Sequence, residues 1–299
     1  MGMTVIICTY AREELLQLTL QTLNRQQLDR RYWEVMIVDN VGRSQTKEIA
    51  HNWGIRYIHE PQEGLSHARN RGYKEASTEW VVYLDDDVQA PDTLLEAFHR
   101  CMLATDCAAV GGYFKHWFRT PPPDWLSKYY ADPYRATNAT VRTRLPEGKY
   151  LPGCVMGVRR TVLEEVGGFD PRLGMQGESI GHAEEDYLQD VIRERGYGVL
   201  FDPDIWLDHL VQPYKYSLIA QYQMAYSHGR ASVFLDSEEA GTTWYGFLAV
   251  YARITLYSVP FNFARWCLKP GYVWQHLLVD SLTKYCYAWG RYTASWDKA

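Results

Sequence analysis

The chain has 299 residues, 46% hydrophobic and 22% charged, which is the composition of a folded protein and excludes a disordered one. Its formal net charge of −5 provides no overall basic surface for a nucleic acid, so we expect no nucleic-acid partner. The six scattered cysteines form no C-x-x-C pair, which argues against a disulfide framework or a zinc knuckle and favours a reducing, cytoplasmic compartment.

Short apolar runs alternate with helical stretches from the start of the chain. The pattern predicts strands at 3–9, 33–40, 55–60, 80–84 and near 107–114, and helices at 13–26, 66–76 and about 91–102. This alternation predicts an α/β fold with a mostly parallel central sheet and helices on both of its faces. Ligands bind such sheets beyond the carboxyl ends of the strands, where Asp39 and Asp85–Asp87 stand.

The order loosens after this region. Residues 119–138 contain four prolines and many aromatic residues, which predicts a long surface loop. A strand is expected at 150–160, a glycine-rich mobile connection at 167–186, a helix at 184–196 and two short strands within 197–209.

The most unusual stretch is the acidic run that follows the apolar strand 80–84. Asp85, Asp86 and Asp87 are adjacent like charges, so a positive partner is expected beside them. A hard divalent cation suits such oxygen ligands, usually with phosphate oxygens completing its shell, whereas a solvated turn is the alternative. The sequence contains neither G-x-x-x-x-G-K-[ST] nor a G-x-G-x-x-G after a strand, so side chains and the metal would have to hold a nucleotide.

Six motifs occur in one order: TY (9–10), VDN (38–40), GLSHARNRG (64–72), YLDDDV (83–88), LPGCVMGVRRTVLEEVGGFD (151–170) and EED (184–186). Together they resemble the family-2 inverting glycosyltransferases of the GT-A fold over roughly residues 3–210. The resemblance implies a GT-A catalytic domain at 1–212, with a nucleotide-binding half at about 1–110 and an acceptor half at about 111–212. Residues 213–299 would form a helical extension. The donor would be a nucleotide-diphosphate sugar, with a UDP-sugar favoured, and the acceptor a glycan or a lipid-linked sugar.

The resemblance also implies roles for single residues. Thr9, Tyr10 and Asp39 would line the nucleoside, and Arg69 would lie near the donor. Within the D-x-D element, Asp85 would face the ribose or a metal-bound water, Asp86 would contribute to donor binding, and Asp87 would bind Mn²⁺ or Mg²⁺ directly. The family often has an asparagine after Thr-Tyr; Ala11, Arg12 and Glu13 stand here instead, which leaves the nucleobase contacts open.

Two histidines raise further questions. Some relatives complete the metal shell with a histidine downstream of the base, which would be His209 here; a structural histidine at a strand end is the alternative. His182, inside the glycine-rich connection, would approach the acceptor or donor if that segment closes.

An inverting transfer needs a base for the acceptor hydroxyl and a counter-charge for the departing diphosphate. Asp186, which opens a predicted helix, matches the family's catalytic base, and Glu185 is the neighbour that would share or orient the proton. The alternative is that Glu184, Glu185 and Asp186 only complement the positive N-terminus of the helix.

The C-terminal segment has a composition of its own. Residues 244–299 carry six basic and two acidic residues and 15 of the 43 aromatic residues. Arg253 and Pro260 leave no uncharged stretch of the ~20 residues that a membrane span requires. A stripe at helical spacing (Phe247, Tyr251, Ile254, Tyr257 or Ser258, Phe261) suits a helix in the headgroup region of a membrane, hence a peripheral contact at the cytoplasmic face. A helix packed on the catalytic domain or on a partner subunit fits the pattern equally.

Two other functions stay open at this point. A sugar-nucleotide pyrophosphorylase uses a similar sheet and acidic metal ligands, but it normally opens with a glycine-rich loop, and "CTYARE" (8–13) lacks those glycines. A non-catalytic carbohydrate-binding protein of the same fold is the other alternative; the intact acidic triplet and Asp186 speak against it.

Overall fold

The computed structural model describes residues 2–235 and 243–294. The chain divides into two compact units. The first, here called the sheet unit, consists of residues 1–117, 132–177 and 184–210, and the second, the helical unit, consists of residues 118–131, 178–183 and 211–299. Two short segments that precede residue 212 therefore group with the C-terminal helices.

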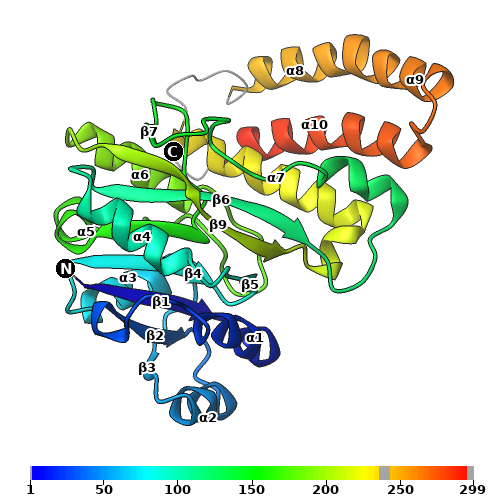
Figure 1. The fold of residues 1–299 in the computed structure, drawn as a ribbon. Helices are drawn as coiled ribbons and strands as arrows, with labels where there is room; N and C mark the ends of the chain where they lie inside the picture. The colour runs from blue at the N-terminus through cyan, green and yellow to red at the C-terminus, as the bar shows by residue number, and fades with distance from the viewer. Residues whose placement is uncertain (1, 236–242, 295–299) are drawn as a thin grey trace. The chain divides into compact units, whose positions relative to one another are not determined.

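A nine-stranded mixed sheet forms the centre of the sheet unit (Figure 1). Its strands are β1 (Met3–Thr9), β2 (Trp33–Asp39), β3 (Arg56–His59), β4 (Trp80–Asp85), β5 (Val88–Gln89), β6 (Ala109–Trp117), β7 (Thr143–Arg144), β8 (Val155–Arg159) and β9 (Val199–Leu210). Along the sheet the order is β3-β2-β1-β4-β8-β6-β9-β5, and β7 pairs with β9.

The predicted α/β fold is confirmed, and the predicted parallel order holds for β3, β2, β1 and β4. Beyond β4 the sheet is mixed, because β8 enters antiparallel to both β4 and β6, whereas β6 and β9 are parallel. Apolar periodicity identifies a buried strand but does not tell the direction in which it enters the sheet.

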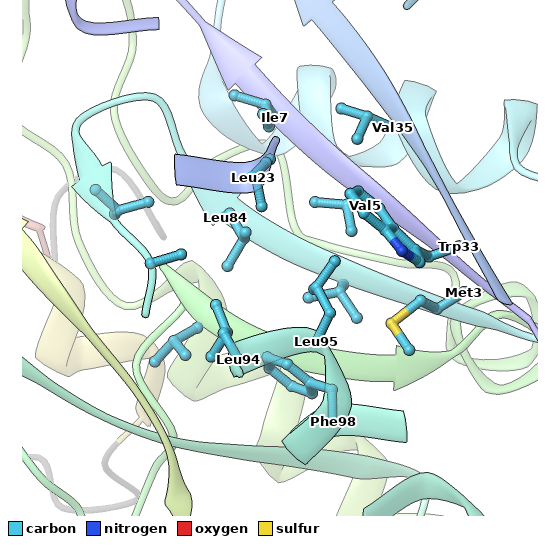
Figure 2. Packing of buried hydrophobic residues seen from close by; sticks show 14 of the residues in the cluster. Met3, Val5, Ile7, Leu23, Trp33, Val35, Leu84, Leu94, Leu95 and Phe98 are labelled. Carbon is cyan, nitrogen blue, oxygen red and sulfur yellow. The ribbon is translucent and has the colours of Figure 1, made fainter. Parts of the chain in front are cut away.

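Helices cover both faces of the sheet, as expected for strands that are buried on both sides. They are α1 (Glu13–Leu23), α2 (Ser44–Asn52), α3 (Leu65–Glu75), α4 (Leu94–Leu103), α5 (Arg160–Val166) and α6 (Glu184–Glu194). Side chains alternate along β1, so Val5 and Ile7 pack with residues of α1 and α4, including Phe98, whereas Ile6 packs on the opposite face with residues of α3, α5 and α6. Figure 2 shows part of the first of these clusters, with labelled side chains from β1, β2, β4, α1 and α4.

Residues 197–209 were predicted as two short strands, which is wrong: a single strand, β9, runs from Val199 to Leu210. The interruption suggested by Asp202-Pro203-Asp204 is a bulge, since Gly111 pairs with Phe201 whereas Tyr113 pairs with Trp206. Gly112 makes the bulge possible, because a Cβ there would lie 1.6 Å from the carbonyl oxygen of Ile205. The long β9 then brings His209 to the edge of the sheet that holds the acidic run.

The predicted helical C-terminal region is present. It contains α7 (Leu218–Leu235), α8 (Trp244–Arg253), a π-helical turn (Ile254–Ser258), α9 (Val259–Leu268) and α10 (Trp274–Ala294). Within the helical unit, α10 packs on α7, and the run from α8 to α9 lies along α10 (Figure 1). None of the described helices is long and apolar enough to cross a membrane.

Candidate active site

The acidic run lies where two parallel strands end side by side. Cys8 of β1 is in register with Asp85 of β4, so the residues that follow the two strands meet at the same edge of the sheet. Thr19 of α1 stabilises the acidic turn, because its hydroxyl oxygen accepts a hydrogen bond from the Val88 backbone N–H at 3.1 Å and lies 2.8 Å from the carbonyl oxygen of Asp86.

The positive partner that the acidic run requires includes Arg12. Its Nη2 lies 2.6 Å from Asp86 Oδ1, and its Nη1 lies 3.0 Å from Asp87 Oδ2. Thr9 Oγ1 donates a hydrogen bond of 2.6 Å to the other oxygen of Asp86. The Asp86 side chain is fully buried, and burial raises its pKa to about 7 although Arg12 and Thr9 oppose the rise.

In the sequence analysis Arg12 was named only as part of the stretch Ala11, Arg12 and Glu13, which departs from the family's usual asparagine after Thr-Tyr. A cation three residues beyond the end of one buried strand, when another buried strand ends in three carboxylates, is the signal that could have identified it. The structure thus answers part of the question that the acidic run raises.

The carboxylates of Asp85 and Asp87 also lie close to His209. Strand β5 pairs antiparallel with β9, so Val88 lies opposite His209, and the Leu210 N–H donates to the carbonyl oxygen of Asp87 at 3.1 Å. His209 Nε2 is therefore 3.1 Å from Asp87 Oδ1 and 3.6 Å from Asp85 Oδ2. One ligand atom from each of the three residues lies within 4.8 Å of the others, a donor set of two carboxylates and an imidazole that could hold a divalent cation.

Arg69 connects this cluster to the start of α6. The side chain is buried, with Nη1 2.9 Å from Glu184 Oε1 and Nη2 3.4 Å from Asp85 Oδ1. Gly153 leaves room for the guanidinium, since a Cβ at that position would lie 3.0 Å from Nη2. The arginine predicted to lie near the donor thus bridges the acidic run and the EED motif.

The first turn of α6 carries three acidic residues, of which Glu184 is buried and Glu185 and Asp186 are half-buried. Burial, together with the charges of Glu185 and Asp190, raises the pKa of Asp186 to about 8, while Arg193 opposes the rise. Burial and Glu185 likewise raise the pKa of Glu184 to about 8, against the effect of Arg69. A carboxyl group with such a pKa can take up and release a proton near neutral pH.

Two positions beside the site have strained backbone. Among the described residues that are not glycine, positive φ is found at Ala11 (55°) and Ala183 (72°). Ala11 directly precedes Arg12, and Ala183 directly precedes Glu184 at the start of α6. Such conformations persist where the surrounding structure enforces them, and they are frequent at functional sites.

The VDN motif follows β2. The carboxylate of Asp39 is buried and accepts hydrogen bonds from the Val41 N–H (2.9 Å), the Arg43 N–H (2.8 Å) and the Tyr57 hydroxyl (2.9 Å). Asn40, which the sequence analysis did not single out, stabilises the loop that leads to α3. Its amide nitrogen donates to the carbonyl oxygens of residues 60 and 62, and its amide oxygen accepts from the N–H of residue 64. Tyr10 is half-buried, and it directly follows Thr9, which is in register with Asp39.

His182 belongs to the segment Glu178–Ala183 of the helical unit. Its ring stacks on that of His228 from α7, with centroids 3.7 Å apart and planes at 8°. Ser227 Oγ donates a hydrogen bond of 2.7 Å to the carbonyl oxygen of Ile180 in the same segment. Burial, with the charges of His228 and Lys215, lowers the pKa of His182 to about 3, so the imidazole is neutral. Its approach to a substrate stays a prediction.

Comparison with known proteins gives a consistent result. Residues 4–167 match the family described as glycosyl transferase family 2. The chain is 26% identical over 227 residues to the glycosyltransferase AglE of Haloferax volcanii, an alignment that covers 74% of this chain and 71% of the relative. It is 24% identical over 234 residues to the glucosyl-dolichyl phosphate glucuronosyltransferase of the same organism, covering 72% of this chain and 71% of the relative.

Among solved structures, the mannosyltransferase PcManGT from Pyrobaculum calidifontis in complex with GDP-Man and Mn²⁺ is similar with a TM-score of 0.65 at 20% identity, over 99% of this chain and 88% of that one. The structure of GalNAc-T7 with UDP, GalNAc and Mn²⁺ is similar with a TM-score of 0.56 at 15% identity, over 78% of this chain and 51% of that one. These likenesses establish the GT-A fold of the catalytic region.

Proposed function

Because the chain belongs to glycosyltransferase family 2, we propose that it transfers a sugar, with inversion, from a nucleotide-diphosphate sugar to a hydroxyl group of a glycan or lipid-linked acceptor. The observation that carries the proposal is the bridge made by Arg69, which joins Asp85 of the acidic run to Glu184 at the start of α6. The residues suited to bind the metal and the donor are thereby held next to the helix that carries the proposed base.

Asp85, Asp87 and His209 would hold the metal ion, and their donor atoms are close enough together for one cation. The donor set suits Mn²⁺ or Mg²⁺, and the imidazole favours Mn²⁺ between the two. When bound, the ion would supply Lewis-acid stabilisation of the departing diphosphate. The Phe114 ring contacts the His209 ring edge to face, with centroids 4.9 Å apart, and so restricts the orientation of the imidazole.

Asp186 would take the proton from the acceptor hydroxyl as the new glycosidic bond forms. Its raised pKa makes the carboxylate a stronger base than an exposed aspartate. Glu185 would orient or share that proton; its Oε1 lies 3.4 Å from the Gly153 N–H, which restrains the side chain.

Burial suggests other roles for Thr9 and Asp86 than the donor contacts expected from the sequence. The Asp86 side chain is fully buried, accepts a hydrogen bond from Thr9 and pairs with Arg12. We therefore propose that Thr9 and Asp86 position Arg12 and the Asp87 carboxylate rather than contact the nucleotide. For Tyr10 we propose the role expected from the sequence, a contact with the nucleoside of the donor. Asp39 would act by fixing the turn that follows β2, since its carboxylate already accepts three hydrogen bonds.

A lipid-linked acceptor is the version we favour. One relative is named for a transfer that involves glucosyl-dolichyl phosphate, and the C-terminal aromatic and basic segment suits a peripheral position at the cytoplasmic face of a membrane. A UDP-sugar stays our predicted donor, and the donor screen described below identifies the sugar.

A donor screen tests the proposal. UDP-, GDP- and dTDP-sugars are incubated with the protein and Mn²⁺, with and without lipid extract as acceptor, and the released nucleotide is identified. We expect a nucleoside diphosphate from one donor class. Release of pyrophosphate in the presence of a nucleoside triphosphate and sugar phosphate would instead identify a pyrophosphorylase, and no metal-dependent nucleotide binding would indicate a non-catalytic protein.

A further inference from the structure

The helical unit exposes an unusual amount of apolar surface on one continuous helical run. Of the 21 large hydrophobic side chains that are exposed in the described part of the chain, ten lie between residues 244 and 268. They are Trp244, Tyr245, Leu248, Tyr251, Leu256, Tyr257, Phe261, Phe263, Trp266 and Leu268. Of residues 244–268, only Ile254 and Asn262 are buried. Scattered exposed hydrophobic residues are ordinary, but a concentration of this kind marks an interaction surface.

The opposite face of the same run packs against α10. The Phe247 ring stacks on Tyr292 of α10 with centroids 4.9 Å apart, and Asn262 Nδ2 donates to Ser281 Oγ at 3.1 Å. Thr255, in the π-helical turn between these positions, lies 2.7 Å from the hydroxyl of Tyr285. The run is therefore anchored on α10 along its length, and the exposed Tyr251 takes part in this packing, its ring centroid 4.6 Å from that of Tyr285. Most of the exposed apolar side chains lie outside these contacts and form a second surface.

The charges on this surface have one sign. Residues 244–269 contain three basic residues and no acidic residue. Arg253 and Lys269 are exposed, and Arg265 is half-buried with its Nη1 3.5 Å from Asp280. On α10, the exposed Lys284 adds a further positive charge. An apolar, aromatic and basic surface complements a lipid bilayer that contains anionic headgroups.

A second copy of the chain is the alternative occupant, and the charges disfavour it. Two such surfaces face to face would bring like charges together, with no acidic residue in 244–269 to pair with them. Tryptophan and tyrosine, which supply five of the ten exposed residues, have an apolar body and a polar tip and are enriched where hydrocarbon meets headgroups.

We propose that the run formed by α8, the π-helical turn and α9 lies in the plane of an anionic bilayer, with its exposed aromatic residues among the lipid headgroups and acyl chain ends. The purpose of this membrane contact rests on the proposed function. A lipid-linked acceptor is confined to a membrane, and the contact would hold the enzyme at the same membrane. Binding to the membrane itself requires neither donor nor acceptor.

The test is flotation of the full-length protein with vesicles, without any sugar nucleotide. One set of vesicles is phosphatidylcholine alone, and the other contains roughly one third phosphatidylglycerol, an anionic lipid. We expect flotation with the anionic vesicles, weakened at high salt, and a blue shift of tryptophan emission that brominated lipids quench. No flotation with either set would overturn the proposal.

Variants locate the surface. Leu256→Gln with Phe261→Gln removes two highly exposed side chains, and the matched control Leu103→Gln with Ile219→Gln removes two exposed side chains elsewhere. We expect at least a ten-fold loss of vesicle affinity in the first pair and none in the second, with an unchanged circular dichroism spectrum. Arg253→Gln with Lys269→Gln, which leaves Arg265 and Lys284 in place, should reduce the preference for the anionic vesicles.

Sedimentation of the unmodified protein completes the experiment. A dimer that the Leu256→Gln/Phe261→Gln variant dissociates, together with vesicle binding that this variant leaves unchanged, would assign the surface to a second copy and overturn the proposal. Since donor hydrolysis in detergent-free solution is measured separately, loss of transfer chemistry and loss of membrane binding are distinguishable.

Discussion

The substitution Asp186→Asn should abolish sugar transfer and at the same time stabilise the folded protein. Asparagine has nearly the same shape but cannot accept the proton of the acceptor hydroxyl, so we expect a rate loss of about 10²–10⁴-fold. Nucleotide affinity should change little, because the metal and donor residues lie on other elements. The gain in stability follows from the burial that raises the pKa of the native carboxyl group.

The size of that gain can be worked from the pKa. The unfolded chain ionises Asp186 near its ordinary value of 3.8, whereas the folded protein holds the proton up to about pH 8. Each pH unit between 3.8 and 7 costs the folded state about 1.4 kcal/mol, which sets an upper limit of about 4 kcal/mol at pH 7. Residual exposure and protons shared with neighbouring carboxyl groups reduce this to about 1–2 kcal/mol, or on the order of 2 °C in Tm per kcal/mol.

The size of the gain depends on pH, and its sign follows from the direction of the pKa shift. A folded-state pKa above the unfolded value means that the wild-type protein loses stability as pH rises between the two, so the variant's advantage is absent near pH 4, grows toward pH 8 and is constant above it. Thermal unfolding between pH 5 and 9 measures it. Glu194→Gln, at an exposed carboxyl on the same helix, is the control and should change neither Tm nor rate. Equal loss of nucleotide binding and transfer, or no gain in Tm at pH 8, would refute the assignment.

Three further predictions concern the same site. Arg12→Met removes a cation that binds Asp86 and Asp87 and should cost about 2–3 kcal/mol of stability, with partial recovery on adding Asp86→Asn; additive losses in denaturant unfolding would contradict the pairing. Chelation of divalent cations should abolish transfer and Mn²⁺ should restore it, so full activity after dialysis against a chelator would exclude the metal role. The transfer rate at saturating substrates should rise with pH toward about 8, because only ionised Asp186 accepts a proton; a rate that falls over pH 6–8 would assign the base elsewhere.

The sequence predicted those parts of the structure that depend on local pattern. The strand that ends at Asp85 and the helix that begins at Glu184 are visible as apolar runs and acidic caps, and the fold that follows from them is confirmed. The acidic run could be proposed as a metal site from residue type, and His209 from the resemblance to the family; the structure brings Asp85, Asp87 and His209 together.

Contacts between distant segments could not be predicted in the same way. Arg12 and Asp86 are 74 residues apart and meet only because β1 and β4 are neighbours in register. The bridge from Arg69 to Glu184 spans 115 residues and requires Gly153 to leave room for the guanidinium. Asn40 likewise stabilises a loop by hydrogen bonds to three of its backbone groups, and no pattern in the sequence predicts such contacts.

Pulsed electron paramagnetic resonance of bound Mn²⁺ tests most directly the claim that the acidic run and His209 hold one metal ion. In the presence of the nucleoside diphosphate identified by the donor screen, we predict a nitrogen coupling from an imidazole ligand that is absent in His209→Gln and kept in Asp208→Asn, whose side chain points to the other face of β9. Asp87→Asn should weaken Mn²⁺ affinity at least ten-fold. Tight Mn²⁺ binding with no nitrogen coupling, or with the same spectrum and affinity in all three variants, would contradict the account.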